Sequence, residues 1–130
     1  MKYAYPAIFT PDNAGYSIRF PDVEGCYTSA DTLAEGLEMA SDALCLMLYD
    51  MEENGGVIPA ASRLTDVAAQ EGEIVTLVAC DTVEYRKFYD NRAVKKTLTI
   101  PAWLNTMAER AGVNFSTTLQ AALKQELNIH

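Results

Sequence analysis

Hydrophobic and polar residues alternate along two short segments near the start of the chain. Residues 3–9 read YAYPAIF, and residues 16–20 read YSIRF, so every second side chain is apolar. This period of two predicts two β-strands, and the turn-forming stretch PDNAG between them predicts a hairpin. Pro6 has no amide proton, so we expect the first strand to lie at a sheet edge or to be unpaired at this residue.

The apolar period then changes from two to that of a helix. Apolar residues recur every three or four positions across residues 31–54, and Asp31 or Ser29 is suited to cap the helix that this pattern predicts. Leu46 and Tyr49 widen the apolar surface beyond one stripe. The interpretation that we favour is deeper core, and the alternative is a face kept for a partner. The expected buried stripe is Leu33, Leu37, Ala40, Leu44, Met47, Leu48 and Met51.

Two further strands complete the predicted first domain. Residues 26–28 fit a short third strand, and residues 73–80, EIVTLVAC, form a β-rich run of the kind found inside a sheet. The order β-β-β-α-β predicts an α+β domain over residues 1–81. Residues 82–94 are mixed and basic, and we expect a linker or a short helix there.

Residues 95–130 predict a strand, a helix, a turn and a second helix. In KKTLTIP at 95–101, the apolar side chains Leu98 and Ile100 point to one side. A helix over 102–111 follows Pro101, a residue suited to the first helical turn. Gly112 is a natural stop, and Asn114 is suited to cap the second helix.

This last segment is too short to bury a stable core alone, and its strand has no partner within it. A second copy of the chain would supply both, because two strands pair as an antiparallel ribbon and four helices enclose one core. We therefore expect a homodimer, with dimers possible as units of a tetramer. The alternative is that the strand completes the sheet of the first domain.

A two-stranded ribbon has a width that fits the DNA major groove. Lys95, Thr97 and Thr99 face outward from the predicted ribbon and are suited to contact base edges, and Lys96 is placed to reach a phosphate. The start of the second helix offers amides and hydroxyls to another phosphate. The candidate DNA-binding residues are Lys95, Lys96, Thr97, Thr99, Asn114, Ser116 and Thr117.

The net charge also differs between the predicted first domain and the rest of the chain. The formal net charge is −8 overall, with −11 over residues 1–81 and +3 over residues 82–130. A basic partner suits the first part, and a polyanion suits the second. The candidate residues for binding a basic protein are the acids Asp22, Glu24, Glu35 and Glu38, together with Leu46 and Tyr49.

The sequence carries no pattern of an enzyme, a cofactor site or a metal site. His130 is the single histidine and the last residue, so Ser and Cys nucleophiles lack the usual base. The acids that a metal-dependent nuclease would need, among them Asp12 and Asp31, fit turn and capping roles. Three widely spaced cysteines are typical of buried, reduced thiols in a cytoplasmic protein. The sequence shows neither a membrane-spanning run nor a secretion signal.

The sequence resembles two known protein families, one in each part of the chain. Residues 95–127, with KTLTIP and the AGVNFS turn, are similar to ribbon-helix-helix DNA-binding modules. Residues 1–80 resemble HicB antitoxins in a Tyr-Pro opening strand, a G-Y hairpin strand, F-P-D, G-C, and a helix start DTLAEGL in which Gly36 replaces the usual Ala. The resemblance spans nearly the whole chain.

The resemblance implies a two-sided antitoxin. Its first domain is expected to have a pared-down ribonuclease H fold and to cover the working face of a small basic HicA-type ribonuclease toxin. Its last segment is expected to bind the operator DNA of its own operon and repress it. Two alternatives stay open: a free-standing regulator whose first domain senses a ligand or oligomerises, and a residual metal-dependent nuclease using Asp12 or Asp31.

Overall fold

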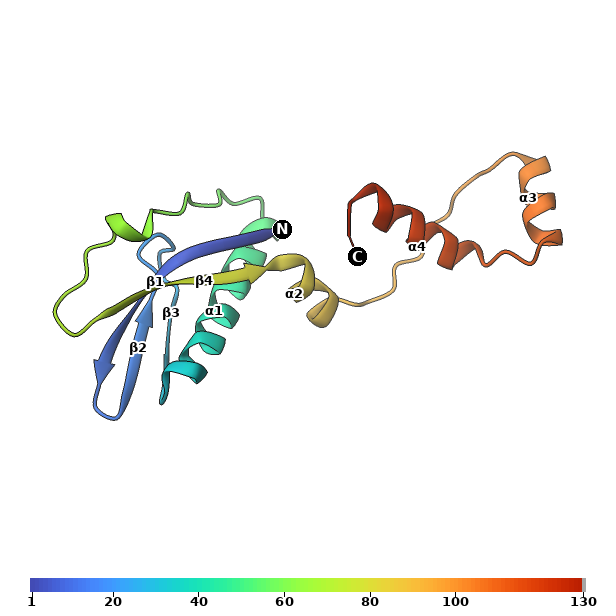
Figure 1. The fold of residues 1–130 in the computed structure, drawn as a ribbon. Coiled ribbons are helices and arrows are strands. Elements are labelled where there is room, and N and C mark those ends of the chain that lie inside the picture. The colour runs from blue at the N-terminus through green and yellow to red at the C-terminus, as the bar shows by residue number, and fades with distance from the viewer. Residues whose placement is uncertain (130) are drawn as a thin grey trace. The chain divides into compact units, whose positions relative to one another are not determined.

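The computed structural model describes residues 1–129. The chain forms two compact units, Met1–Arg92 and a second that begins at Ala93. Figure 1 shows the succession of elements along the chain. No helix in the described part of the chain has both the length and the apolar character needed to cross a membrane.

The first unit is built on a four-stranded antiparallel sheet. Its strands are β1 (Lys2–Asp12), β2 (Gly15–Arg19), β3 (Tyr27–Ala30) and β4 (Ile74–Asp81). Their order across the sheet is β3-β2-β1-β4. The predicted order β-β-β-α-β and the α+β class are confirmed. However, β4 is an edge strand, although its run of apolar residues favoured a place inside the sheet.

The position of Pro6 differs from the prediction in part. β1 lies in the middle of the sheet, and Pro6 is opposite Leu77 of β4. The pairing of β1 with β2 begins only at Ile8, which is opposite Arg19. The edge position is therefore wrong, while the expected lack of pairing at Pro6 holds on the β2 side. β2 and β4 pair with different stretches of β1. This offset allows a central strand to include a residue that has no amide proton.

One long helix follows the third strand. α1 (Leu33–Glu53) begins after Thr32, whose hydroxyl accepts a hydrogen bond from the Glu35 amide at 3.1 Å. The cap is thus Thr32, and the predicted caps Asp31 and Ser29 are wrong. A cap hydroxyl must sit directly before the first helical residue to reach the amide three positions on, and only Thr32 meets this condition.

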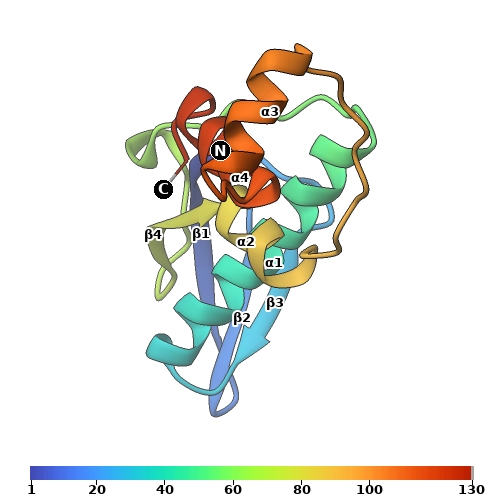
Figure 2. The same cartoon turned by 90° about the vertical axis from the view of Figure 1, so that its right-hand side faces the viewer.

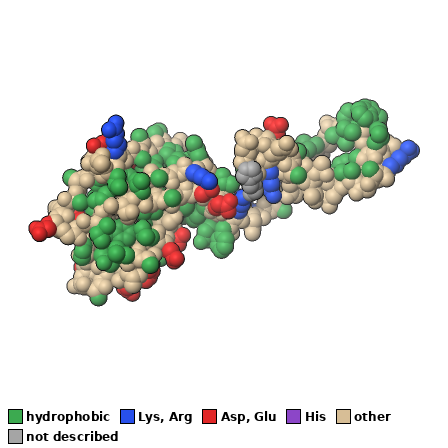
Figure 3. Space-filling view, viewed as in Figure 1, with side chains coloured by type: hydrophobic (Ala, Val, Ile, Leu, Met, Phe, Trp, Pro, Cys, Tyr) green, Lys and Arg blue, Asp and Glu red, His purple; other side chains and the backbone are tan. Residues whose placement is uncertain are grey.

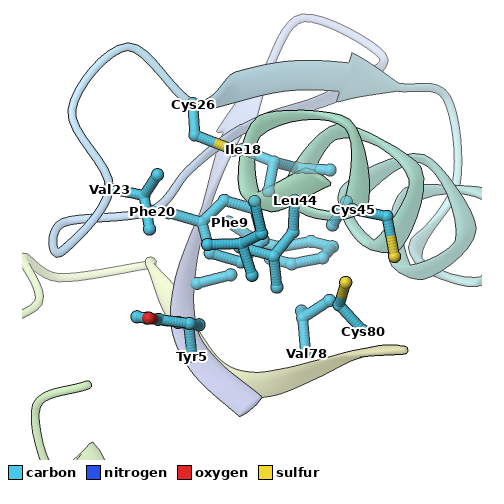
Figure 4. Packing of buried hydrophobic residues seen from close by; sticks show 13 residues of the cluster. Tyr5, Phe9, Ile18, Phe20, Val23, Cys26, Leu44, Cys45, Val78 and Cys80 are labelled. Atoms are coloured by element: carbon cyan, nitrogen blue, oxygen red, sulfur yellow. The ribbon is translucent and has the colours of Figure 1, made fainter. Parts of the chain in front are cut away.

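α1 covers one face of the sheet, as Figure 2 shows. Figure 4 shows Phe9 at the centre of the buried cluster, with Ile18 and Leu44 beside it and Val78 at one side. Leu33 and Leu37, predicted to be buried, are 43% and 44% exposed. In this part of α1, contact with the sheet is made by Gly36, which lies against Phe9 and Ile18, so the two leucines flank the contact. The fully buried residues of α1 are Ala40, Leu44 and Leu48.

Side-chain hydrogen bonds hold the long connection between α1 and β4, which includes a 3₁₀ turn at Leu64–Asp66, against the sheet. The Tyr5 hydroxyl donates to the carbonyl of Pro59. Asp22 accepts from both the amide and the hydroxyl of Ser62, at 2.8 and 2.6 Å. These contacts fix the part of the connection that precedes the 3₁₀ turn.

A second helix belongs to the first unit. α2 (Thr82–Tyr89) begins after Asp81, whose carboxylate accepts from the Val83 amide at 3.0 Å. A short helix in this segment was predicted, but the compact unit continues past the predicted boundary at residue 81 to Arg92. The reason is that α2 packs against α1 through the rings of Tyr49 and Tyr85.

Three buried, unpaired thiols lie in the first unit, as the sequence predicted. Burial raises the pKa of Cys26 to about 11. Burial, and then a hydrogen bond with Cys45, raises the pKa of Cys80. Figure 4 shows the sulfurs of Cys45 and Cys80 turned toward each other between α1 and β4. All three are part of the hydrophobic core.

The second unit contains two helices. α3 (Ala102–Arg110) and α4 (Phe115–Glu126) are joined by a turn in which Gly112 has φ of +70°. The predicted stop at Gly112 is therefore confirmed, since glycine adopts this conformation without strain. Residues 95–100 form no strand in the single chain and no part of the four-stranded sheet. A strand needs a hydrogen-bonding neighbour, and the described residues of one chain supply none.

Candidate functional site

The solvent-facing side of α1 brings together most of the residues predicted to bind a basic protein. Glu35, Glu38, Leu46 and Tyr49 follow one another at helical spacing, and Met39 lies between them. Leu46 is 55% exposed and Met39 is 40% exposed. The favoured assignment of Leu46 to the core is therefore wrong, and the alternative of an accessible face describes it.

Tyr49 is held by the second helix. Its ring centroid lies 5.2 Å from that of Tyr85, and the guanidinium of Arg86 lies 4.7 Å from its centroid. Arg86 donates to Glu52 at 3.0 Å and also to Glu53. These contacts fix α2 on the end of α1 and limit the rotation of the Tyr49 ring.

The carboxylate of Glu52 connects this helix pair to the first strand. It accepts hydrogen bonds from the hydroxyls of Tyr3 at 2.7 Å and Thr82 at 3.0 Å, besides the one from Arg86. Burial opposes its ionisation, but the three hydrogen bonds outweigh burial and lower the pKa of Glu52. Burial together with Glu52 raises the pKa of Tyr3 to about 12. This network is structural, because every polar group in it has a partner.

Asp22 and Glu24 precede α1 in the chain, in the turn between β2 and β3. The surroundings of the two side chains differ from each other. Both carboxylate oxygens of Asp22 are occupied by Ser62, so Asp22 ties two loops together. Glu24 is exposed in the turn that precedes Cys26. Asp22 is one of the six residues predicted to bind a basic protein. In the structure its carboxylate instead makes an intramolecular contact with Ser62.

The acids considered for metal-dependent cleavage have local roles. Asp12 accepts a hydrogen bond from Ser17 across the β1–β2 hairpin at 3.5 Å, and Asp31 is exposed just before the cap of α1. Among residues 1–129, no three His, Cys, Asp or Glu side chains are grouped so that they would hold a metal ion. His130 lies outside the described residues.

The predicted DNA-binding residues lie in two stretches of the second unit. Lys95, Lys96, Thr97 and Thr99 are all exposed in the extended segment before α3. At the start of α4, Asn114 acts as the predicted cap and accepts from the Thr117 amide at 3.1 Å.

That cap changes what the start of α4 offers to an anion. The Thr117 amide is already bound to Asn114, and the hydroxyl oxygen of Ser116 accepts from Gln120 at 3.1 Å. The donors that remain for a phosphate are the hydroxyls of Ser116 and Thr117 and the amides before Thr117. The structure therefore supports fewer backbone contacts than the sequence indicated.

The second unit exposes apolar side chains along both of its helices and the segment before them. Leu98 is 58% exposed, Trp103 65% and Met107 62%. Neither α3 nor α4 contains a buried residue. Figure 3 shows hydrophobic side chains at the surface of α3. An apolar surface of this kind on so short a segment is typical of a protein interface.

Sequence reasoning missed the aromatic side chains of α2. Tyr85, Phe88 and Tyr89 lie at helical spacing in TVEYRKFY, and this spacing is the signal that would have revealed an aromatic face. Its basic residues drew attention to charge instead. Phe88 is 75% exposed and Tyr89 64% exposed.

The fold is a small α+β unit followed by a pair of helices, and both units expose apolar side chains. A family model described as the HicB-like antitoxin of bacterial toxin-antitoxin systems matches residues 5–122. The chain belongs to this HicB-like antitoxin family. The match spans both compact units.

Three similar proteins extend this result. An uncharacterised 14.9 kDa protein from the rep-hol intergenic region of Haemophilus phage HP1 is 30% identical over 103 residues, covering 77% of this chain and 74% of that protein. Antitoxin HicB 2 of Photorhabdus laumondii is 38% identical over 58 residues, covering 45% of this chain and 42% of that protein. A chain of a toxin-antitoxin complex from Streptococcus pneumoniae is 29% identical with a TM-score of 0.62, covering 97% of this chain and 99% of that one.

Proposed function

We propose that this chain neutralises a HicA-type ribonuclease toxin by direct binding and represses its own operon by binding operator DNA. The observation that carries the proposal is the likeness, over 97% of the chain, to a protein solved in a toxin-antitoxin complex. The first unit contacts the toxin, and residues 95–130 form a ribbon-helix-helix module. The protein acts by binding and does no chemistry itself.

Electrostatic attraction supports the first activity. The first domain has a formal net charge of −11 over residues 1–81. Glu35 and Glu38 project from the solvent-facing side of α1 beside Leu46. Acids around an apolar centre attract a basic protein from solution and exclude other acidic ones. A toxin that binds RNA presents a cationic face to its phosphates, so the antitoxin and the RNA compete for that face.

Exposed apolar residues support pairing of two second units. Leu98 and Ile100 are 58% and 46% exposed in a segment that has no strand partner in its own chain. In a dimer, two such segments pair as an antiparallel ribbon, and the apolar sides of α3 and α4 enclose a shared core. The ribbon then presents two sets of Lys95, Thr97 and Thr99 to the major groove.

The test is purification of the tagged chain from cells that also express the small basic protein encoded beside it. We expect the two proteins to co-purify in a fixed ratio, and we expect the complex to have no ribonuclease activity. A matched preparation carrying only the second unit serves as the control and should not retain the toxin. If the full chain retains no neighbouring product but still shifts its own upstream DNA, a free-standing regulator describes it better.

A further inference from the structure

A row of aromatic rings runs from α1 onto the surface of α2. The ring centroids of Tyr49 and Tyr85 are 5.2 Å apart, those of Tyr85 and Tyr89 are 4.5 Å apart, and those of Tyr89 and Phe88 are 4.8 Å apart. Tyr85 is partly buried against the hydrophobic core. The row therefore begins at the core and ends in solvent.

The helix that carries the row is fixed on α1, although the end of the row is exposed. Arg86 binds both Glu52 and Glu53, and its guanidinium covers the Tyr49 ring. These contacts attach α2 to the end of α1 independently of Phe88. An aromatic side chain on a fixed helix has only two χ angles and loses little conformational entropy when a partner covers it, so it contributes strongly to binding.

The exposed apolar surface continues along α1. Leu46 lies one turn before Tyr49 on the same side of the helix, and Met39 lies two turns further toward the helix start. Together, Met39, Leu46 and Tyr49 with the rings of α2 form one surface, which we call the α1–α2 face. Figure 3 shows hydrophobic side chains exposed next to acidic ones where α2 lies.

The charges on the α1–α2 face select the kind of partner. Glu35, Glu38 and Asp42 interleave with its apolar residues and form no ion pair within the described part of the chain. The charge of Arg86 is already matched by Glu52 and Glu53. The complementary surface is therefore apolar at its centre and carries lysine or arginine at its border.

We propose that the α1–α2 face is the docking surface for the toxin, with Phe88, Tyr89 and Leu46 as its apolar centre and the acids of α1 as its border. This inference rests on the proposed function and specifies where on the first unit the toxin binds. Exposed rings that sit on a fixed helix are the residue type that dominates binding energy at protein interfaces.

The first experiment measures the dissociation constant between the full chain and the purified small basic protein encoded beside it. The variant is Leu46→Ala/Phe88→Ala, which removes side chains that are 55% and 75% exposed. The control is Tyr27→Ala/Leu77→Ala, which removes side chains that are 76% and 52% exposed on the sheet. We expect the first variant to bind at least about tenfold more weakly, and the control to stay within about twofold of wild type.

A second experiment tests the border of the face by charge. The Glu38→Gln/Asp42→Asn variant is compared with Asp66→Asn/Glu71→Gln, which removes two acids from the connection between α1 and β4. At low salt the first pair should slow association by roughly threefold to tenfold, and the difference should vanish at high salt. The control pair should alter the rate less, because its charges lie off the docking face.

The outcomes separate this inference from the proposed function. No binding by the wild-type chain would contradict the proposed function itself. Binding by wild type, with equal affinity in Leu46→Ala/Phe88→Ala and normal circular dichroism, would overturn only the α1–α2 face. A change in self-association in that variant, with toxin affinity unchanged, would instead assign the face to a second copy of this chain and would equally overturn the inference.

Discussion

Gly36 allows the first turns of α1 to lie directly on the sheet. A Cβ atom added at Gly36 would come within 2.8 Å of the Phe9 ring and 3.1 Å of the Ile18 side chain. Both neighbours are fully buried, so neither ring nor methyl has free space to move into. An alanine at this position would therefore force Phe9 or Ile18 to shift.

We predict that Gly36→Ala lowers the free energy of unfolding. Overpacking a well-filled core costs about 1–3 kcal/mol, while replacing glycine by alanine inside a helix returns about 1 kcal/mol. Chemical denaturation at fixed protein concentration measures the net effect. In the Gly36→Ala/Phe9→Leu double variant, the two destabilisations should be less than additive, because the smaller side chain makes room. A more stable Gly36→Ala variant would contradict the close contact.

Glu73 is a second residue whose role depends on distant partners. It accepts hydrogen bonds from the Thr10 hydroxyl at 2.6 Å, the Gln70 amide at 2.7 Å and Arg19 at 3.2 Å. These bonds lower the pKa of Glu73 from 4.5 to about 2. The folded state thus favours the ionised carboxylate more than the unfolded chain does.

The prediction for Glu73 concerns acid stability. Because its pKa is lowered on folding, its contribution to stability is present above pH 4.5 and is lost as the pH falls toward about 2. The Glu73→Gln variant should be less stable than wild type near neutral pH and should lose less stability across this window. Denaturant midpoints at several pH values test it, with the exposed neighbour Glu71→Gln as the control. Parallel pH profiles for wild type and Glu73→Gln would refute the assignment.

At the scale of the elements, α2 and the segment 95–100 differ in what holds them. α2 is fixed by rings and ion pairs to α1, so it belongs to the first unit and not to a connection between the units. Residues 95–100 have no neighbouring strand, and all of them are exposed. The first element is therefore fixed within one chain, while the second has no regular structure in one chain.

We predict that the segment 95–100 reads DNA through its outward side chains. The triple variant Lys95→Ala, Thr97→Ala, Thr99→Ala should weaken binding to the protein's own upstream DNA by about 1–3 kcal/mol for each good hydrogen bond to a base that it removes. Lys96→Ala should weaken all sequences alike and lower the salt slope by roughly one unit. Gel shifts measure both, and Lys124→Ala near the end of α4 is the control. Unchanged affinity and selectivity in a triple variant that still dimerises would show that another element reads the DNA.

At the scale of the whole molecule, the two units differ in how much apolar surface they bury within one chain. The first unit has a complete core, whereas α3 and α4 contain no buried residue. We predict that the full chain sediments as a dimer and that Leu98→Asp raises its dissociation constant at least about tenfold, because a charge would be buried in the shared ribbon. Val57→Asp, at a position that is 90% exposed in the first unit, is the control. A wild-type chain that remains monomeric at every concentration would exclude the ribbon.

By itself, the sequence determined the type and order of the elements in the first unit and the two helices of the second unit. The alternation of YAYPAIF, the helical period of α1, the helix start after Pro101 and the stop at Gly112 are all local signals. It also indicated Leu46 and Tyr49 as an apolar surface beside the helix stripe, and it placed Asn114 as a cap. Each of these depends on residues only a few positions apart.

The tertiary structure alone decided which residues meet across the chain. The sheet order put Pro6 in a central strand, Gly36 brought α1 onto Phe9, and Ser62 occupied Asp22. Tyr49 gained Tyr85 as a neighbour, and this contact joins the segment predicted as a linker or short helix to the first unit. Contacts between residues far apart in the chain depend on how whole elements pack, and periodicity within one element carries no information about its neighbours.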